Sequence, residues 1–260
     1  MRLSDRCYAV TGLGYSPPWS VNAGIVAGDL LTLAVDTGGN TLAAQLIYGY
    51  ASAVRLGNQL RVINTEKHFD HIGGNAFFLE RGIEVWGHSG IRRTPGEFQE
   101  EIAGFNAAIP NAARRQRGEA SAFFWQTRMA NPNRQIETDT CFDLGGLTAE
   151  ILLTPGHTPT NLSVWVPQDR VVFTGDCLIR EYLPNLDAGT PSDWQTWLES
   201  TGTPRGTAAG NRGSGPRAGC SRRRSGISSG DGPSGAVGIH QTRVFAHCAS
   251  LWNGLTFKRH

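Results

Sequence analysis

The chain has 260 residues, of which 39% are hydrophobic and 18% charged, so it can bury a full core as one large domain or two small ones. No apolar run approaches the roughly eighteen residues of a membrane-spanning helix, and Met1 to Arg6 lack the apolar core of a signal peptide. The formal net charge of +2 conceals an asymmetry, because residues 201–260 carry nine Lys and Arg against one acid, which leaves −6 for the rest. These features argue against a membrane protein and predict a globular, cytoplasmic one.

The five cysteines are scattered and include no Cys-x-x-Cys pair. They are Cys7, Cys141, Cys177, Cys220 and Cys248. An odd, dispersed set of this kind argues against a disulfide framework and against a thiolate zinc site. We therefore expect buried or idle thiols.

The first two hundred residues alternate between strand and helix patterns. Short apolar runs, many of them β-branched, predict strands at Ala23–Ala27, Leu30–Val35, Gln59–Ile63, Ile83–Trp86, Leu147–Leu153, Leu162–Val166 and Arg170–Phe173. Helical spacing and capping residues predict helices at Asn40–Val54 with Asn40 as cap, Gly73–Glu80, Pro95–Ala108 and Ser192–Glu199 with Ser192 as cap. An aromatic cluster at Phe123–Trp125 is interpreted as a staple over the core or as a substrate wall. The alternation predicts an α/β fold.

The loop from Glu66 to His71 places four potential metal ligands within six residues. Glu66, His68, Asp70 and His71 occupy positions one, three, five and six, so their side chains can point to two sides. One such loop can hold two adjacent cations. It follows the strand Gln59–Ile63, and open α/β sheets build their sites at the carboxyl ends of strands.

Two further predicted strands end in potential ligands. His157 lies in Thr154-Pro-Gly-His157, and Asp176 lies in Thr174-Gly-Asp176. Each sits in a Gly-containing turn just past its strand. A single His-x-Asp-His could be an ion-paired loop, but the repeated context predicts a metal centre.

These motifs resemble the metallo-β-lactamase superfamily over about residues 7–200. The matching pieces are Asn22–Val26, Val35-Asp-Thr-Gly38, His68-Phe-Asp-His71-Ile-Gly-Gly-Asn75, Pro155-Gly-His157-Thr-Pro and Phe173-Thr-Gly-Asp176. The resemblance implies an αββα sandwich, in which two mixed β-sheets are flanked by helices and the metals lie at one sheet edge.

The resemblance also implies a role for each residue. Glu66, His68 and His157 would form a first metal site, Asp70 and His71 would serve a second, and Asp176 would bridge both. Asp36 would orient the ligand loop without touching metal. Two divalent ions would lower the pKa of a shared water to near neutrality and polarise the carbonyl under attack. Asp70 and His71 are the catalytic candidates, with Asp70 steering or accepting a proton.

Two departures from the family pattern affect the metal. Glu66 stands where the family has histidine, which leaves zinc as the first choice but admits iron, manganese or a single metal ion, and leaves open whether Glu66 is a ligand or a solvated loop acid. The family's last histidine has no clear counterpart. His240 and His247 are the remaining candidates for it, and His88 is interpreted as a structural residue near the site.

The C-terminal segment differs in composition from the rest. Residues 201–239 are mostly Gly, Ser, Arg, Ala and Pro where a helix should continue and a closing strand should follow. We expect a domain at 1–200 and a tail at 201–260 that is either disordered or the product of a slipped reading frame near codon 200, with the fold incomplete at this end. In the shifted frame, residues 211–219 can encode an apolar strand, and sequencing the gene across this point tests the idea.

The leading functional hypothesis is a metal-dependent hydrolase in which a metal-bound hydroxide attacks an ester, thioester, lactone or amide of a small molecule. Loss of the last histidine would impair this chain. The alternatives are an iron-dependent redox member of the same superfamily, and a catalytically inactive product with a basic tail. Nucleic-acid binding through Arg212–Arg224 is disfavoured because no aromatic residues are interleaved to stack bases. The sequence leaves the oligomeric state open.

Overall fold

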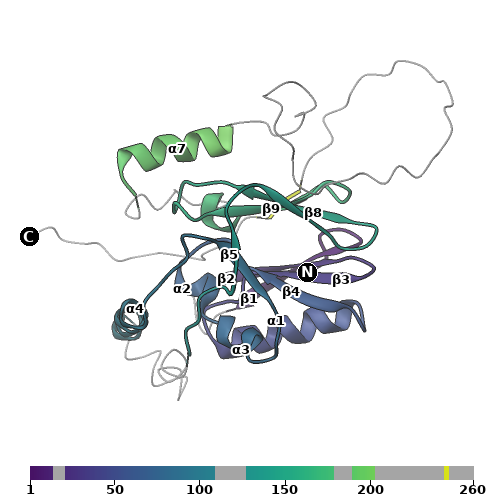
Figure 1. Ribbon diagram of the computed structural model, residues 1–260, viewed down its shortest axis with the longest axis horizontal. Helices are drawn as coiled ribbons and strands as arrows, with labels where there is room; N and C mark the ends of the chain where they lie inside the picture. Colours follow the sequence, from purple (N-terminus) through teal and green to yellow (C-terminus); the bar gives the residue numbers. More distant parts are fainter. Residues whose placement is uncertain (14–20, 109–126, 179–188, 203–242, 246–260) are drawn as a thin grey trace, which may run out of the picture.

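Two β-sheets stack face to face, with helices on both outer sides (Figure 1). The computed structural model describes residues 1–13, 21–108, 127–178, 189–202 and 243–245. Helices α1 and α3 lie beneath one sheet and α7 lies above the other, which gives the αββα arrangement of layers.

The first sheet, sheet A, has the strand order β1-β2-β3-β4-β5-β6. Its strands are β1 (Cys7–Leu13), β2 (Val21–Ala27), β3 (Leu31–Val35), β4 (Gln59–Ile63), β5 (Val85–His88) and β6 (Arg134–Ile136). The first three strands pair antiparallel and the last four pair parallel, so the sheet is mixed. All residues of β2 and β3 are buried, as expected of central strands that are covered on both faces.

The second sheet, sheet B, has the order β11-β10-β9-β8-β7. Its strands are β7 (Thr140–Asp143), β8 (Thr148–Leu153), β9 (Leu162–Val166), β10 (Val171–Phe173) and β11 (Arg243–Phe245). Strands β7 to β10 pair antiparallel in succession, whereas β11 runs parallel to β10. Because β9 is antiparallel to both of its neighbours, β8 and β10 run in the same direction and end at the same edge of the sheet.

The helices are α1 (Thr41–Val54), α2 (Phe69–Ile72), α3 (Asn75–Leu79), α4 (Pro95–Ala108) and α7 (Pro191–Gly202), with a short 3-10 helix, η1 (Gly175–Cys177). The helix predicted over 73–80 corresponds to α3, whereas α2 lies before it within the ligand loop, and Gly73 and Gly74 separate the two helices. A Cβ atom at Gly73 would collide with the carbonyl of Gly39, and one at Gly74 with the carbonyl of Thr37. The break lets the ligand loop pack closely on the loop after β3.

The predicted position and cap of helix α1 are confirmed. Asn40 Oδ1 accepts a hydrogen bond from Ala43 N at 2.9 Å. The face that packs on sheet A is lined by small residues. Its buried residues are Ala43, Ala44, Ile47 and Ala51, whereas the larger Leu42, Leu46 and Tyr50 are more than half exposed. Small side chains allow the helix to approach the sheet closely, so residue size decided which apolar face is buried.

Helix α7 begins earlier than its predicted cap, Ser192. Thr190 is the capping residue, because Thr190 N donates to Asp193 Oδ2 at 2.8 Å and Asp193 N donates to Thr190 Oγ1 at 3.4 Å. Pro191 takes the first helical position, where its missing N–H has no consequence. The capping box therefore corrects the predicted cap by two residues.

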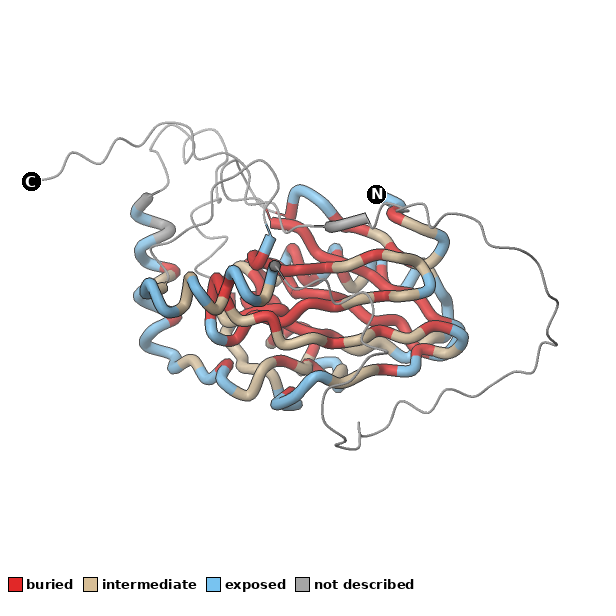
Figure 2. Tube along the Cα trace, turned by 90° about the horizontal axis from the view of Figure 1, so that it is seen from above, coloured by how far each residue is buried: buried red, intermediate tan, exposed pale blue. Residues whose placement is uncertain are grey.

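The main core lies between the two sheets. Seen from above in Figure 2, the buried segments concentrate toward the middle of the molecule. The members of this core from sheet A include Val26, Leu33, Val35 and Ile63, and those from sheet B include Ile151, Leu162, Val164 and Phe173. A second cluster packs α1 and α3 against the other face of sheet A. Full burial of each large aliphatic side chain contributes roughly 1.5–3 kcal/mol, so both sheets are held rigidly beneath their edge loops.

The parallel strands bring the predicted ligand loops to one edge. Val35 of β3 pairs with Ile63 of β4, so Asp36 and the loop that begins at Asn64 leave the sheet side by side. Strands β8 and β10 end at a common edge in sheet B, where the segments that carry His157 and Asp176 follow. The fold thus delivers candidate ligands from both sheets.

No helix in the described ranges combines the length and hydropathy needed to cross a bilayer.

Phe123–Trp125, His240 and His247 lie outside the described residues, as does all of the predicted tail except Thr201, Gly202 and β11. Those predictions stay predictions.

Candidate metal centre

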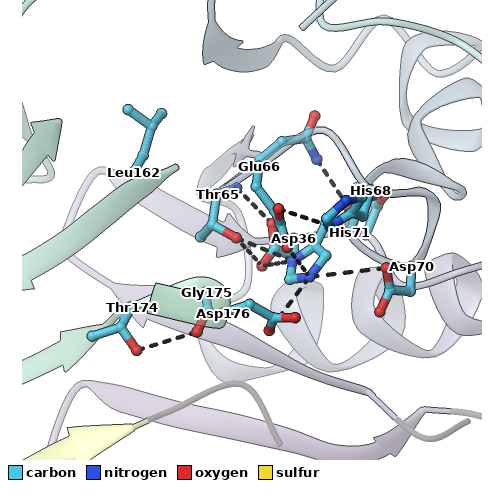
Figure 3. Close-up of polar contacts among 12 residues, drawn as sticks. Asp36, Thr65, Glu66, His68, Asp70, His71, Leu162, Thr174, Gly175 and Asp176 are labelled. Carbon is cyan, nitrogen blue, oxygen red and sulfur yellow. Dashed lines mark hydrogen bonds and ion pairs between the residues drawn. The ribbon is translucent and has the colours of Figure 1, made fainter. Parts of the chain in front are cut away.

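The loop after β4 turns its charged side chains inward. The side chains of Glu66 and His71 are fully buried, and that of His68 is 27% exposed. Figure 3 shows the side chains of this loop converging with that of Asp176, which comes from η1. Four segments that are distant in the sequence therefore meet at one place: the loops after β3, β4 and β8, and η1 after β10.

A first set of donor atoms comes from Glu66, His68 and His157, whose ligand atoms all lie within 4.8 Å of one another. His68 Nδ1 is 3.2 Å from His157 Nε2 and 2.9 Å from Glu66 Oε2. The spacing suits one cation held by two imidazoles and a carboxylate.

A second set comes from Glu66, His71 and Asp176, again with all donor atoms within 4.8 Å. His71 Nε2 is 2.9 Å from Glu66 Oε1 and 3.6 Å from Asp176 Oδ1. The other carboxylate oxygen of Asp176 is 3.8 Å from His157 Nε2, so Asp176 faces both sets. Glu66, which the resemblance assigns to the first site alone, belongs to both sets.

Asp70 lies at the margin of this cluster. Its Oδ1 is 4.0 Å from His71 Nε2, its side chain is 26% exposed, and it joins neither donor set within the part of the chain that the structure describes. Five of the six predicted ligands are thus gathered in two sets, with Asp70 beside the second.

The environment of Glu66 fits a bound cation. Its carboxylate is fully buried and lies 2.9 Å from the imidazole nitrogens of both His68 and His71. A buried carboxylate costs several kcal/mol unless positive charge offsets it. The surrounding imidazole nitrogens and carboxylate oxygens are the donors that Zn²⁺, Fe²⁺ and Mn²⁺ accept, so the residues fit a pair of divalent cations.

The metal-free cluster is held as an ion-pair network. Burial opposes charge on each group, but the charges of His68 and His71 hold the pKa of Glu66 well below its usual range. Against burial in turn, the Glu66 carboxylate raises the pKa of His68 to about 9, while Asp36 and then Glu66 raise the pKa of His71 well above its usual value. The imidazoles of His68 and His71 therefore carry protons, and a cation would have to displace these protons to bind.

Asp36 fixes the orientation of His71, as the resemblance implies for this residue. Its Oδ1 accepts from Thr65 N at 2.7 Å, and its Oδ2 accepts from Thr65 Oγ1 at 2.7 Å and lies 3.0 Å from His71 Nδ1. Asp36 adopts a φ of 68°, a left-handed conformation that aspartate tolerates better than most residues. A proton on Nδ1 turns Nε2 toward Glu66 and Asp176.

A buried polar network supports the loop from below, and the sequence reasoning missed most of it. Asn64 Nδ2 donates to His71 O at 3.1 Å, and Asn75 Nδ2 donates to Asn64 Oδ1 at 2.8 Å. Thr37 Oγ1 lies 2.9 Å from His71 O. The one signal in the sequence was the position of Asn64 directly after a strand and before the ligands.

Asn161 and Trp197 connect the two ligand-bearing segments of sheet B. Asn161 Nδ2 lies 3.1 Å from both Thr154 Oγ1 and Thr174 O. Trp197 on α7 donates from Nε1 to the carbonyl of Cys177 at 2.7 Å, and its ring packs edge-on against His157. A single helix residue thus contacts both the residue after Asp176 and the candidate ligand His157.

We expect the Trp197→Phe variant to lose about 1–3 kcal/mol of unfolding free energy, because the buried Cys177 carbonyl loses its donor. We also expect metal affinity to fall by about tenfold, since partners that orient ligands have effects of this size. Thermal unfolding and chelator competition measure the two effects.

Trp194→Phe on the same helix is the matched control. Trp194 Nε1 makes no hydrogen bond to any described residue, so its removal should leave metal affinity unchanged. Equal metal affinities for the two variants would contradict a positioning role for Trp197.

Two other residues singled out by the sequence lie apart from the donor sets. His88 ends β5, where its Nδ1 accepts from Gly90 N at 3.0 Å and burial lowers its pKa. Cys177 is buried and lies in the 3-10 helix η1, next to Asp176.

Comparison with known proteins places the chain among metallo-hydrolases of one superfamily. A model of the metallo-beta-lactamase superfamily matches residues 16–206. The chain is 29% identical over 146 residues to the probable metallo-hydrolase YybB of Bacillus subtilis, covering 56% of each protein. It is 27% identical over 140 residues to the hydroxyacylglutathione hydrolase GloC of Haemophilus influenzae, covering 54% of this chain and 58% of that one. The chain thus spans little more than half the length of these curated relatives.

Solved structures share the fold. A metallo-beta-lactamase family protein from Thermus thermophilus superposes with a TM-score of 0.55 and 22% identity, covering 76% of this chain and 69% of that chain. A metallo-beta-lactamase from Pontibacter korlensis gives 0.52 and 18%, covering 77% and 83%. The likeness confirms the predicted αββα fold class. With the family model matched over residues 16–206, it shows that this chain belongs to the metallo-β-lactamase superfamily.

Proposed function

We propose that the protein is a metal-dependent hydrolase of small esters, thioesters, lactones or amides. The observation that carries the proposal is the convergence of two donor sets on the buried carboxylate of Glu66. The relatives named hydroxyacylglutathione hydrolase and metallo-hydrolase support hydrolysis as the reaction class.

Some of these residues would bind the cations, and others would position or accept protons. Glu66, His68 and His157 would hold one divalent cation, and Glu66, His71 and Asp176 a second. Bound cations at such a site lower the pKa of water to near neutrality and polarise the substrate carbonyl. Asp36 keeps His71 in the tautomer that presents Nε2. Asp70, partly exposed 4.0 Å from His71 Nε2, would accept a proton during the displacement.

Elemental analysis of the purified chain, combined with a hydrolysis assay, tests the proposal. We expect one to two equivalents of a transition metal and turnover of at least one ester, thioester, lactone or amide, with loss of turnover on chelation and recovery on metal return. Less than about half an equivalent of metal in a protein with native circular dichroism would overturn it.

An iron-dependent redox enzyme is a second candidate, favoured by the carboxylate of Glu66 at both donor sets. A carboxylate at position 66 suits iron or manganese better than the histidine that the family has there. Bound iron with a visible absorbance band and no hydrolytic turnover would support this reading over hydrolysis. Under either reading we propose a small-molecule substrate. The cytoplasmic location stays a prediction from the sequence.

Metal binding should release protons and tighten as the pH rises. At pH 7 the raised pKa values of His68 and His71 keep both imidazoles protonated in the metal-free protein, so a cation must displace those protons. We expect affinity to rise about tenfold per pH unit for each displaced proton, and the contribution of His68 to level off above about pH 9. Calorimetry with Zn²⁺ in buffers of different ionisation enthalpy counts the protons. Affinity that stays constant between pH 7 and 8 would refute the expectation.

A further inference from the structure

Glu66 belongs to both donor sets at once, which none of the imidazoles does. Its two oxygens face different partners. Oε2 lies 2.9 Å from His68 Nδ1, whereas Oε1 lies 2.9 Å from His71 Nε2 and 3.7 Å from His157 Nε2. The carboxylate therefore stands between the two positions at which cations would be held.

The chemistry of the side chain makes this sharing possible. A carboxylate ends in two equivalent oxygens that are free to bind separate cations. An imidazole carries its two nitrogens on opposite sides of the ring, and the one that does not ligate usually donates a hydrogen bond to the protein. A glutamate at position 66 can therefore bind two neighbouring cations, whereas a histidine at the same position would bind one.

The composition of the second set points the same way. Without Glu66, this set would keep only one nitrogen and one carboxylate, from His71 and Asp176. With Glu66, each set reaches three donors. Glu66 is fully buried, and each of its oxygens lies 2.9 Å from an imidazole nitrogen of a different set.

We propose that Glu66 bridges the two cation sites, giving one oxygen to each and making each site depend on the other. The inference rests on the proposed function and adds to it a carboxylate-bridged centre. Such a centre is richer in oxygen than one with histidine at this position. It should therefore bind Mn²⁺ or Fe²⁺ more strongly, relative to Zn²⁺, than a Glu66→His variant does.

Titration of the metal-free full-length chain with Mn²⁺ tests the sharing. The wild type should bind two equivalents. Glu66→Gln should lose at least about tenfold in affinity at both steps, because one carboxylate serves both sites. His157→Ala should lose only one equivalent. Glu150→Gln on β8, which is in neither donor set, is the control and should bind as the wild type does.

A Glu66→Gln variant that keeps one Mn²⁺ at wild-type affinity would overturn the bridge while leaving the hydrolase proposal intact. A wild type that binds neither Mn²⁺ nor Zn²⁺ would overturn both. If Glu66→Gln fails to fold by circular dichroism, Glu66→His decides the matter. It should restore one site with His68 and His157, leave the other weak, and shift preference toward Zn²⁺. Two tight sites with unchanged preference in Glu66→His would rule the bridge out.

Discussion

Replacing His157 by alanine is expected to lower hydrolysis by at least about a thousandfold and to remove one bound cation. His157 is buried and supplies one of the three donors of the first set, 3.2 Å from His68. A cation at a hydrolytic site contributes several kcal/mol of charge stabilisation in the transition state, and each 1.36 kcal/mol is a factor of ten in rate. Turnover under saturating metal and elemental analysis measure the two effects.

His88→Ala is the control for this prediction, because His88 lies at the end of a strand of the same chain but joins neither donor set among the described residues. It should keep metal content and turnover close to wild type. A His157→Ala variant that retains native folding, full metal content and turnover would remove His157 from the proposed centre.

The Asp36→Asn variant is expected to bind metal about 10- to 100-fold more weakly, although Asp36 belongs to neither donor set. Asparagine tolerates the left-handed backbone at this position nearly as well as aspartate, so the local conformation is preserved. Its amide NH₂, however, cannot accept the hydrogen bonds from both Thr65 and His71 that the carboxylate accepts. The imidazole would lose its fixed orientation.

The same variant should lower the pKa of His71, because the charge of Asp36 is the largest influence that raises it against burial. The direction of the pKa shift determines how the stability of the metal-free protein depends on pH. A raised pKa in the folded state stabilises the metal-free protein below the unfolded pKa of histidine, and this contribution fades as the pH rises through the folded value. The metal-free variant should therefore lose more stability at pH 6 than at high pH. NMR titration of the His71 ring and urea unfolding at two pH values test this, and an unchanged His71 titration would contradict it.

Local sequence was enough to find most of the site. Glu66, His68, His71, His157 and Asp176 each follow a strand within a few residues, and the spacing of ligands along a loop is a local property. What the sequence could not show is that Glu66 reaches both donor sets, since that depends on how two sheets stack.

The residues that brace the site were harder to predict. Trp197 reaches His157 only because α7 lies over sheet B, and Asn161 joins two turns that come together when β8 and β10 run side by side with β9. Such contacts have no periodic or motif signal. The packed face of α1 was hidden for another reason, because its alanines gave a weaker apolar pattern than the exposed Leu42 and Leu46.

The donor residues come from loops of both sheets, so bound cations would also stabilise the packing of one sheet on the other. Glu66, His68 and His71 stand on sheet A, whereas His157 and Asp176 stand on sheet B, so every bound cation would be a cross-link between the two halves of the sandwich. At a concentration a hundred times its dissociation constant, a ligand of the native state adds about 2.7 kcal/mol to stability. Removing the cations would then do more than stop turnover. It would leave the paired charges and contacts such as the hydrogen bond from Leu162 N to Thr65 O to join the sheets at that edge, and amide exchange should accelerate first in the loops after β4 and β8.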